Sequence, residues 1–335
     1  VNNSPMALLR KLNSRAKTEI NSGFGANASD YGGRFMNKDG RPNIDIRGVG
    51  FLNRISWFHT MLSMPRWKFL TVLFLFYIGI NFIFATIYYL IGVEHLNGIN
   101  SASEWGKFGS AYFFSAQTFT TVGYGHISPQ GFLTSSIAAA EALTGLSSFA
   151  IATGLFYGRF SKPTAYLKFS ENALIAPYKD ITALMFRLAP YKNTTLTDAE
   201  ARVTLGMVIE ENGKMVNRFF PLELEFERAN LLSLNWTIVH PITENSPLYN
   251  FTREDFASIN GEIFVFIKAF DDMFSNTVVD RSSYTLKEVV FGARFEPMYH
   301  RSPAGEKTIL EMEKLNSYTE ADISFAFTSS QIASN

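Results

Sequence analysis

The stretch Thr120-Thr121-Val122-Gly123-Tyr124-Gly125 decides the fold, because it lies between two apolar segments that are each long enough to cross a bilayer. Its glycines accept backbone dihedral angles that residues with a Cβ resist. A strand that turns its carbonyl oxygens toward one axis can replace the water around a dehydrated potassium ion. A chance glycine-rich turn is the alternative interpretation, and the flanking apolar segments argue against it.

Four such strands around one axis form a potassium selectivity filter, so the stretch predicts a homotetramer with K⁺ as its permeant ligand. Gly125 completes the strand, and Thr120 and Tyr124 support it. The Thr121 hydroxyl adds an oxygen at the inner end. The predicted K⁺-binding residues are Thr121, Val122, Gly123 and Tyr124.

Residues 69–93 carry no charged side chain, and at about 1.5 Å per residue they exceed a bilayer core of about 30 Å. Residues 132–158 form a second apolar segment with a single acid, Glu141. Residues 94–129 are too polar and too rich in glycine to span again. Basic residues lie before the first span and at 159–162, so the positive-inside rule predicts a two-span cell-membrane protein with cytoplasmic termini.

The loop between the spans predicts a short helix directly before the filter. Ser101-Ala-Ser-Glu104 has the pattern of a capping box, which would start a helix over about 105–118. The helix would dip into the membrane and aim its negative C-terminal end at the pore, where it favours a cation. Irregular backbone at this depth must be buried in protein or line a pore, and four subunits supply both conditions.

Residues 1–46 are rich in Asn, Ser, Gly and basic side chains, and we expect a flexible or partner-tethered tail. Apolar residues then recur at helical spacing from Leu52 to Leu62, and Pro65 stops the pattern. An amphipathic helix over 47–66 would lie flat on the membrane surface. A short soluble helix packed on another domain is the alternative.

The chain after the second span has the pattern of a β-sandwich. Residues 202–209 and 219–227 are strand-like and flank Asn212-Gly213, a hairpin turn signal. Residues 263–270 predict a strand buried on both faces, and a short helix is expected around 306–314. The predicted parts are a tail over 1–46, an interfacial helix over 47–66, a transmembrane pore domain over 67–160, a cytoplasmic β-sandwich over 161–325 and a tail over 326–335.

The composition of the 335 residues narrows the function classes. The net charge is zero, which makes no case for a nucleic-acid partner. The absence of Cys rules out disulfides, thiol catalysis and cysteine metal sites, and the five His show no metal-ligand spacing. No nucleophile elbow, P-loop or dinucleotide fingerprint is present. We therefore expect no enzyme and no cofactor.

These residues resemble the inward-rectifier potassium channels, in the prokaryotic branch often called KirBac. The resemblance runs from about Leu52 to Pro297. It implies an α+β membrane protein: two transmembrane helices plus a re-entrant pore helix, followed by a cytoplasmic immunoglobulin-like β-sandwich, in a tetramer. Its motifs are Met64-Pro65-Arg66-Trp67, Phe113 to Thr118, the filter, Arg159-Phe160-Ser161-Lys162-Pro163, Trp236 to Pro241 and Gly292 to Pro297.

The resemblance places a gate on the second span. Gly145 and Gly154 match glycines that let the inner helix bend, although close helix packing would equally explain small residues there. Tyr157 matches the position where four bulky side chains close the cytoplasmic mouth. An interface-belt tyrosine is the alternative, and Phe156 would take the role if the register shifts by one residue.

Acidic residues carry further expectations. Glu141 lies within a span, where burying an acid costs free energy. We expect it either to brace the filter through hydrogen bonds or to stay protonated, with its hydrogen bonds satisfied and no functional role. Phe149 stands where strong rectifiers carry an acid, which implies weak block by Mg²⁺ or polyamines. Glu200 and Glu288 match acids lining the cytoplasmic pore, although ordinary solvated charges are an equal alternative.

A basic cluster would gather at the inner leaflet, where each cation attracts anionic lipid at about 1 kcal/mol. The resemblance implies lipid regulation, whereas plain positive-inside anchoring is the alternative. His126 after the filter either titrates at the outer mouth or is a passive loop residue. The cluster comprises Arg66, Trp67, Lys68, Arg159 and Lys162.

Two rival functions remain open to test. A two-span potassium channel gated by a soluble ligand, such as calcium or a nucleotide, would need a sensing domain, and no Rossmann-like fingerprint is present. A membrane-anchored binding protein that conducts nothing leaves the filter stretch unexplained. Barium-sensitive potassium flux distinguishes the channel from this second rival.

Overall fold

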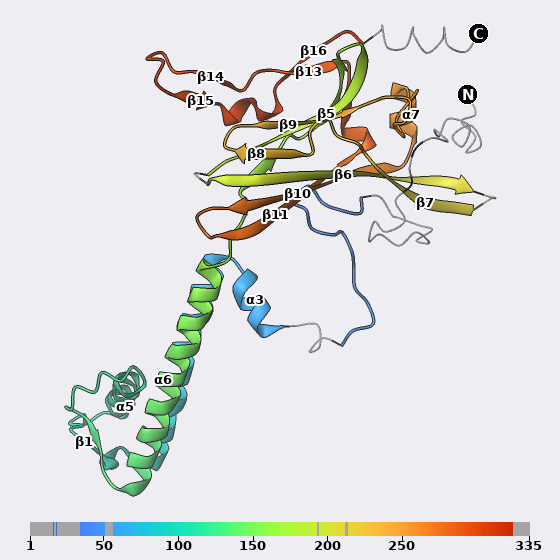
Figure 1. Ribbon diagram of the computed structural model, residues 1–335. Coiled ribbons are helices and arrows are strands. Elements are labelled where there is room, and N and C mark those ends of the chain that lie inside the picture. Colours follow the sequence, from blue (N-terminus) through green and yellow to red (C-terminus); the bar gives the residue numbers. More distant parts are fainter. Residues whose placement is uncertain are drawn as a thin grey trace, which may run out of the picture. The chain divides into compact units, whose positions relative to one another are not determined.

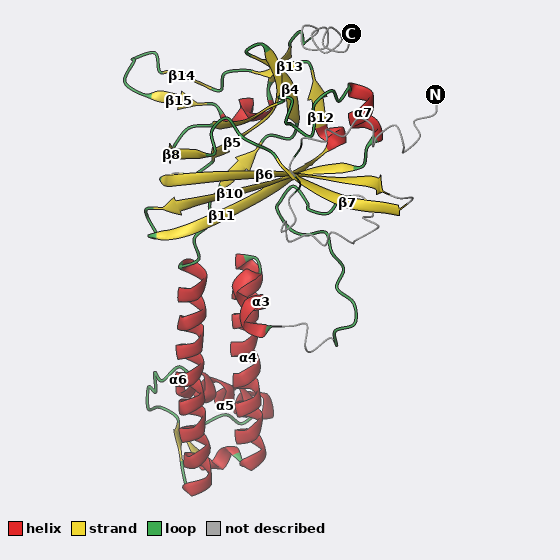
Figure 2. Ribbon diagram, turned by 45° about the vertical axis from the view of Figure 1, so that its right-hand side comes forward, coloured by secondary structure: helices red, strands yellow, loops and turns green. Residues whose placement is uncertain are grey.

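The computed structural model describes residues 16, 18, 34–50, 56–192, 194–211 and 214–323, and the chain divides into two compact units. The helical unit is Arg47–Lys162, and the sandwich unit is Val1–Ile46 with Pro163–Asn335. Figure 1 labels the elements along the chain, and Figure 2 separates helices from strands by colour.

The helical unit contains the two predicted spans, α4 (Arg66–Ile91) and α6 (Phe132–Phe160), both long and apolar enough to cross a membrane. They run side by side, with α5 (Glu104–Phe119) against both (Figure 2). The remaining elements of this unit are α3 (Trp57–Ser63), η1 (Val93–His95), β1 (Leu96–Asn97) and β2 (Ser128–Pro129).

The expected interfacial helix is shorter in its described part than the sequence predicts. Helix α3 follows Ser56, whose hydroxyl accepts a hydrogen bond from the His59 N–H. It ends at Ser63, because Met64 precedes a proline and adopts an extended conformation. Residues 51–55, which include the expected helical Leu52, lie outside the described residues.

The helix before the filter forms as expected, but its predicted capping box is wrong. Ser103, not Ser101, caps α5, and its Oγ accepts from the Gly106 N–H at 3.1 Å. With this start the third helical residue is Gly106, which has no side chain to reach back to the cap. Ser101 instead donates a weak hydrogen bond to the Ser103 carbonyl oxygen at 3.4 Å.

The sandwich unit consists mainly of two five-stranded sheets. One has the order β11-β10-β6-β7 with β8 also paired to β6, and the other has the order β12-β4-β5-β3 with β9 paired to β5. The first sheet comprises β6 (Leu196–Glu211), β7 (Lys214–Pro221), β8 (Arg228–Leu232), β10 (Gly261–Asp271) and β11 (Asn276–Thr285). The second comprises β3 (Leu167–Phe169), β4 (Ala173–Tyr178), β5 (Ile181–Pro190), β9 (Trp236–Pro241) and β12 (Val289–Phe291).

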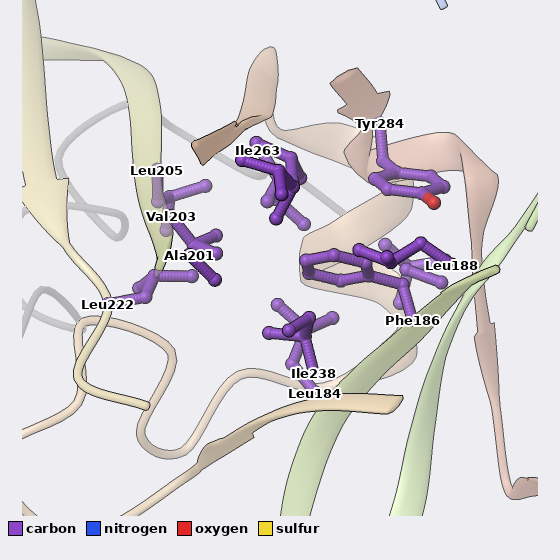
Figure 3. Packing of buried hydrophobic residues seen from close by; sticks show 14 of the residues in the cluster. Leu184, Phe186, Leu188, Ala201, Val203, Leu205, Leu222, Ile238, Ile263 and Tyr284 are labelled. Carbon is purple, nitrogen blue, oxygen red and sulfur yellow. The ribbon is translucent and has the colours of Figure 1, made fainter. Parts of the chain in front are cut away.

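Apolar side chains from both sheets form one core, in which Phe186 of β5 and Val203 of β6 belong to the same buried cluster (Figure 3). Helix α7 (Arg253–Ser258) contributes Phe256 to this core. The chain ends its described part with η2 (Leu286–Glu288), β13 (Ala293–Phe295), β14 (Tyr299–Arg301), β15 (Thr308–Leu310), η3 (Met312–Asn316) and β16 (Tyr318–Glu320).

The strand predictions hold in part. Strands β6 and β7 pair antiparallel up to Glu211 and Lys214, as the predicted hairpin requires, and the expected turn at 212–213 lies outside the described residues. Its second strand ends at Pro221, and the expected continuation to 227 is wrong. Strand β10 is buried on both faces only in its first half, because Lys268 and Phe270 turn toward solvent.

The helix expected around 306–314 is wrong. Residues Thr308–Leu310 form strand β15, which pairs with β14 across a turn containing Gly305. Only residues Met312–Asn316 are helical, in a short 3₁₀ turn. The pairing partner, which a local helical pattern cannot reveal, decides the conformation here.

The expected flexible tail is also wrong for residues 34–43, which pack on the sandwich. Met36 is buried against Phe264, and the N–H groups of Phe35 and Met36 donate to the Glu262 carboxylate at 2.7 and 3.0 Å. Arg34 donates to the Ser283 carbonyl oxygen at 2.5 Å. These contacts join the segment to β10 and β11.

Candidate functional site

The backbone of the filter stretch alternates in handedness. φ is positive at Thr121 (59°), Gly123 (53°) and Gly125 (80°), but not at Val122 or Tyr124. Alternating right- and left-handed residues turn successive N–H groups to one side, and therefore successive carbonyls to the other. A β-branched residue at positive φ is costly and persists only where its surroundings impose it, as at Thr121.

Hydrogen bonds to the end of α5 hold the filter amides. The Thr121 N–H donates to the Thr118 carbonyl at 3.0 Å, and the Val122 and Gly123 N–H groups donate to the Gln117 carbonyl at 3.0 and 3.4 Å. Among the described residues, no hydrogen bond uses the carbonyl oxygens of 121–124. These oxygens remain available to a cation.

Thr120 and Tyr124, both predicted to support the filter strand, differ in the contacts they make within the subunit. The Thr120 hydroxyl donates to the Ala116 carbonyl at 2.7 Å and so fixes the start of the strand. Tyr124 is 79% exposed, and within its own subunit it braces nothing. Its supporting role therefore stays a prediction that requires a neighbouring copy of the chain.

Glu141 is buried between the three long helices, as the sequence suggested for an intramembrane acid. Tyr88 of α4 donates to its Oε2 at 2.6 Å, and Ser115 of α5 contacts its Oε1. Glu141 therefore braces the pore helix rather than the filter strand itself.

The two inner-helix glycines lie in different environments. A Cβ built on Gly145 would stand 1.9 Å from the Phe119 carbonyl oxygen, at the last residue of α5. A Cβ on Gly154 would have no neighbour within 4 Å. Close packing thus explains Gly145, whereas no contact within the subunit explains why residue 154 is a glycine.

The two candidate gate residues, Phe156 and Tyr157, differ in their surroundings. The Phe156 ring packs edge-to-face on Phe69 of α4 at a centroid distance of 5.1 Å. Tyr157 is 74% exposed, so it is the one of the pair that is free to meet other copies of the chain. Phe149, at the position relevant to rectification, is likewise exposed.

The predicted basic cluster does not act as one group. Arg66, Trp67, Lys68 and Lys162 are exposed, and the Lys68 Nζ lies 5.4 Å from the Trp67 ring centroid. Arg159 instead donates to the carbonyls of Met61 and Met64 at 3.2 and 2.5 Å. Carbonyl groups at the C-terminal end of a helix have no N–H partner within the helix. Arg159 supplies the missing hydrogen-bond donors at this end of α3.

The two acids predicted to line the cytoplasmic pore, Glu200 and Glu288, are each paired with basic side chains. Glu200 accepts from Arg202 at 2.8 Å, and this hydrogen bond lowers the pKa of the Glu200 carboxyl. Glu288 pairs with Arg34 at 3.1 Å and Lys38 at 3.2 Å. Burial raises the pKa of Glu288, but the Thr285 N–H and these two cations bring it below its usual value. A pore-lining role stays a prediction for both, and His126 is exposed.

Sequence reasoning missed Tyr88 and Ser115, the partners of Glu141, and Asn81, which accepts from Ser115. One signal was present. Asn81 lies in the middle of the first span, and a polar side chain at such a depth is expected to bind a partner.

Known proteins match both units of the chain. A family model described as ion channel matches residues 76–162, and one described as inward rectifier potassium channel C-terminal domain matches residues 167–334. The inward rectifier potassium channel Kirbac3.1 of Paramagnetospirillum magnetotacticum is 32% identical over 281 residues, which cover 82% of this chain and 92% of that protein.

More distant matches agree with this assignment or do not bear on it. The ATP-sensitive inward rectifier potassium channel 12 of Bos taurus is 26% identical, over 79% of this chain and 67% of its own. Among solved structures, the sporulation control protein Spo0M of Bacillus subtilis covers 40% of this chain and 58% of its own at 10% identity. Its TM-score of 0.22 is too low to support an argument about the fold.

A filter strand held between two membrane-spanning helices, followed by a β-sandwich, defines an ion channel subunit. The chain belongs to the inward rectifier potassium channel family, which confirms the resemblance read from its motifs. It is a membrane protein with two spans, and its sandwich unit lies on the cytoplasmic side. Its matched relatives are ion channels, not enzymes.

Proposed function

We propose that four copies of this chain assemble around one axis into a passive, potassium-selective channel. The observation that carries the proposal is the alternating sign of φ at 121–125, together with the hydrogen bonds that turn the amides of Thr121, Val122 and Gly123 toward α5. One strand offers a cation only one side of a coordination shell, and four strands complete it. The chain carries out no chemical step, and K⁺ is its permeant ion.

The gate of this channel is the ring of four Tyr157 side chains, exposed in each subunit. Anionic lipid headgroups bind at Arg66, Lys68 and Lys162, which are exposed beside the ends of the spans. Because Phe149 carries no charge, block by Mg²⁺ or polyamines is weak. Barium, which matches the size of K⁺, blocks at the filter.

Rubidium uptake into liposomes containing the purified tetramer tests the proposal. Uptake should be inhibited by barium, should not be supported by sodium, and should change with the fraction of anionic lipid. Gly123→Ala should abolish it, because φ is +53° at Gly123 and alanine resists that conformation.

Gly79→Ala in α4 is the matched control, because a Cβ there meets nothing within 4 Å. A monomeric protein without uptake would refute the channel, and unchanged uptake in Gly123→Ala would refute the assignment of the filter to residues 121–125.

A further inference from the structure

Four polar side chains meet in the interior of the helical unit, beside the pore helix. Asn81 and Tyr88 come from α4, Ser115 from α5 and Glu141 from α6, and all four are buried. Three oxygen–oxygen contacts join them in a row: Asn81 Oδ1 to Ser115 Oγ at 3.0 Å, Ser115 Oγ to Glu141 Oε1, and Glu141 Oε2 to Tyr88 Oη at 2.6 Å.

The orientation of the Asn81 amide follows from its other contact. Its Nδ2 lies 2.7 Å from the Tyr77 carbonyl oxygen, which can only accept a hydrogen bond. The amide nitrogen must therefore face Tyr77, and the Oδ1 must face Ser115. As an oxygen acceptor, Oδ1 supplies no hydrogen to that contact.

Each of the three oxygen–oxygen contacts needs one hydrogen, but the row contains only two hydroxyl groups. Tyr88 donates its hydrogen to Glu141 Oε2. Ser115 has one hydrogen and two oxygen neighbours, and Asn81 Oδ1 takes it because that oxygen has none of its own. We propose that Glu141 carries the third hydrogen on Oε1 as a neutral acid that donates to Ser115, and that Asn81 is the positioning residue that makes it a donor.

Burial supports the neutral form. An ionised carboxylate inside a membrane protein is costly unless a cation pairs with it. The groups that face Glu141 are Tyr88 from α4 and Ser115 from α5, and neither is charged. Among the described residues, no salt bridge reaches Glu141, so no cation offsets the cost of burying an ionised carboxylate there.

The donated hydrogen bond holds the pore helix. Ser115 lies two residues before Gln117, whose carbonyl accepts the amides of Val122 and Gly123. The row therefore links both spans to the residue that anchors the filter strand. Ser115 transmits the position of Glu141, and Asn81 fixes the direction in which the hydrogen bond runs.

Infrared spectroscopy of the tetramer in lipid at neutral pH tests the protonation directly. A protonated carboxyl group has a C=O stretching band that a carboxylate lacks, and exposed acids are ionised at this pH. The difference spectrum of wild type minus Glu141→Gln should contain this band. A difference spectrum without it would overturn the proposal.

Asn81→Leu tests the positioning role. It removes the acceptor of the Ser115 hydrogen, so Ser115 becomes free to donate to Glu141 and the band should shift. Thr86→Val is the matched control, because Thr86 lies on the same helix and donates only to the Phe82 carbonyl. An unshifted band in Asn81→Leu would remove Asn81 from the mechanism.

Rubidium uptake supplies a second readout, which alone rests on the proposed channel function. Glutamine at 141 can donate to Ser115 and accept from Tyr88, so Glu141→Gln should retain uptake, whereas Glu141→Leu should lose it. Loss of uptake in both variants would show that the channel needs the ionised carboxylate, and would overturn the proposal. If the wild type itself takes up no rubidium, the channel function fails, and the infrared result still decides the protonation.

Discussion

Replacing Gly145 by alanine should damage the filter, although Gly145 lies in a different helix. The added Cβ would stand 1.9 Å from the Phe119 carbonyl oxygen, 2.7 Å from its carbon and 3.0 Å from its Cα. Ordinary van der Waals contact begins at 3.4 Å. All three neighbours are backbone atoms, so no side-chain rotation can relieve the clash, and α5 must move relative to α6.

The expected cost is that of overpacking a close interface, about 1–3 kcal/mol. The displaced residue immediately precedes Thr120, so the movement reaches the filter strand. Gly154→Ala is the matched control on the same helix, because its Cβ meets nothing within 4 Å in the subunit. There the substitution should stabilise the helix by up to about 1 kcal/mol.

Two assays measure the outcome. Rubidium uptake in the presence of competing sodium reports selectivity, and the temperature at which the tetramer dissociates in detergent reports stability. Gly145→Ala should lower both, and Gly154→Ala should lower neither selectivity nor stability. If Gly145→Ala kept the selectivity and the stability of the wild type, the close contact between α5 and α6 would not be the reason for a glycine at position 145.

Three further predictions concern single side chains. Arg187 is buried and donates to the carbonyls of residues 296, 314, 315 and 317. Arg187→Met should therefore destabilise the sandwich unit by about 3 kcal/mol or more, and its β-strand circular dichroism signal should be lost at a lower temperature. Arg159→Ala should speed amide hydrogen exchange at the end of α3 by about tenfold, whereas Lys162→Ala should not, because Arg159 donates to the carbonyls of Met61 and Met64 and, within the described residues, Lys162 donates to neither. Burial lowers the pKa of His240, whose Nδ1 donates to the Glu223 carbonyl and whose Nε2 accepts from Ser246. The unfolded chain then binds more protons, so stability should fall as pH drops below about 6.5, and His240→Gln should flatten this dependence in thermal unfolding.

Much of the helical unit could be predicted from the sequence, because its signals are local. A run of apolar residues identifies a span wherever it packs, and the pattern of glycines in the filter stretch selects its backbone conformation. Except for the capping of α5, which is a local error, the errors arose where the partner that decides the outcome is not part of the local pattern. Residues 34–43 lack apolar periodicity, yet the buried Glu262 carboxylate and the packing of Met36 on Phe264 hold them.

The sequence by itself determined the two spans, the helix before the filter, the filter and the family, since each depends on residue type and spacing along the chain. Only the tertiary structure decided which glycine is packed, which cation ties α3 to α6, and which partners Glu141 has. The physical reason is that hydrogen bonds and close backbone contacts depend on direction and distance, whereas apolar burial does not. Apolar burial needs only a pattern, whereas a hydrogen bond or a close backbone contact needs two specific groups at one distance, and three-dimensional packing alone brings them together.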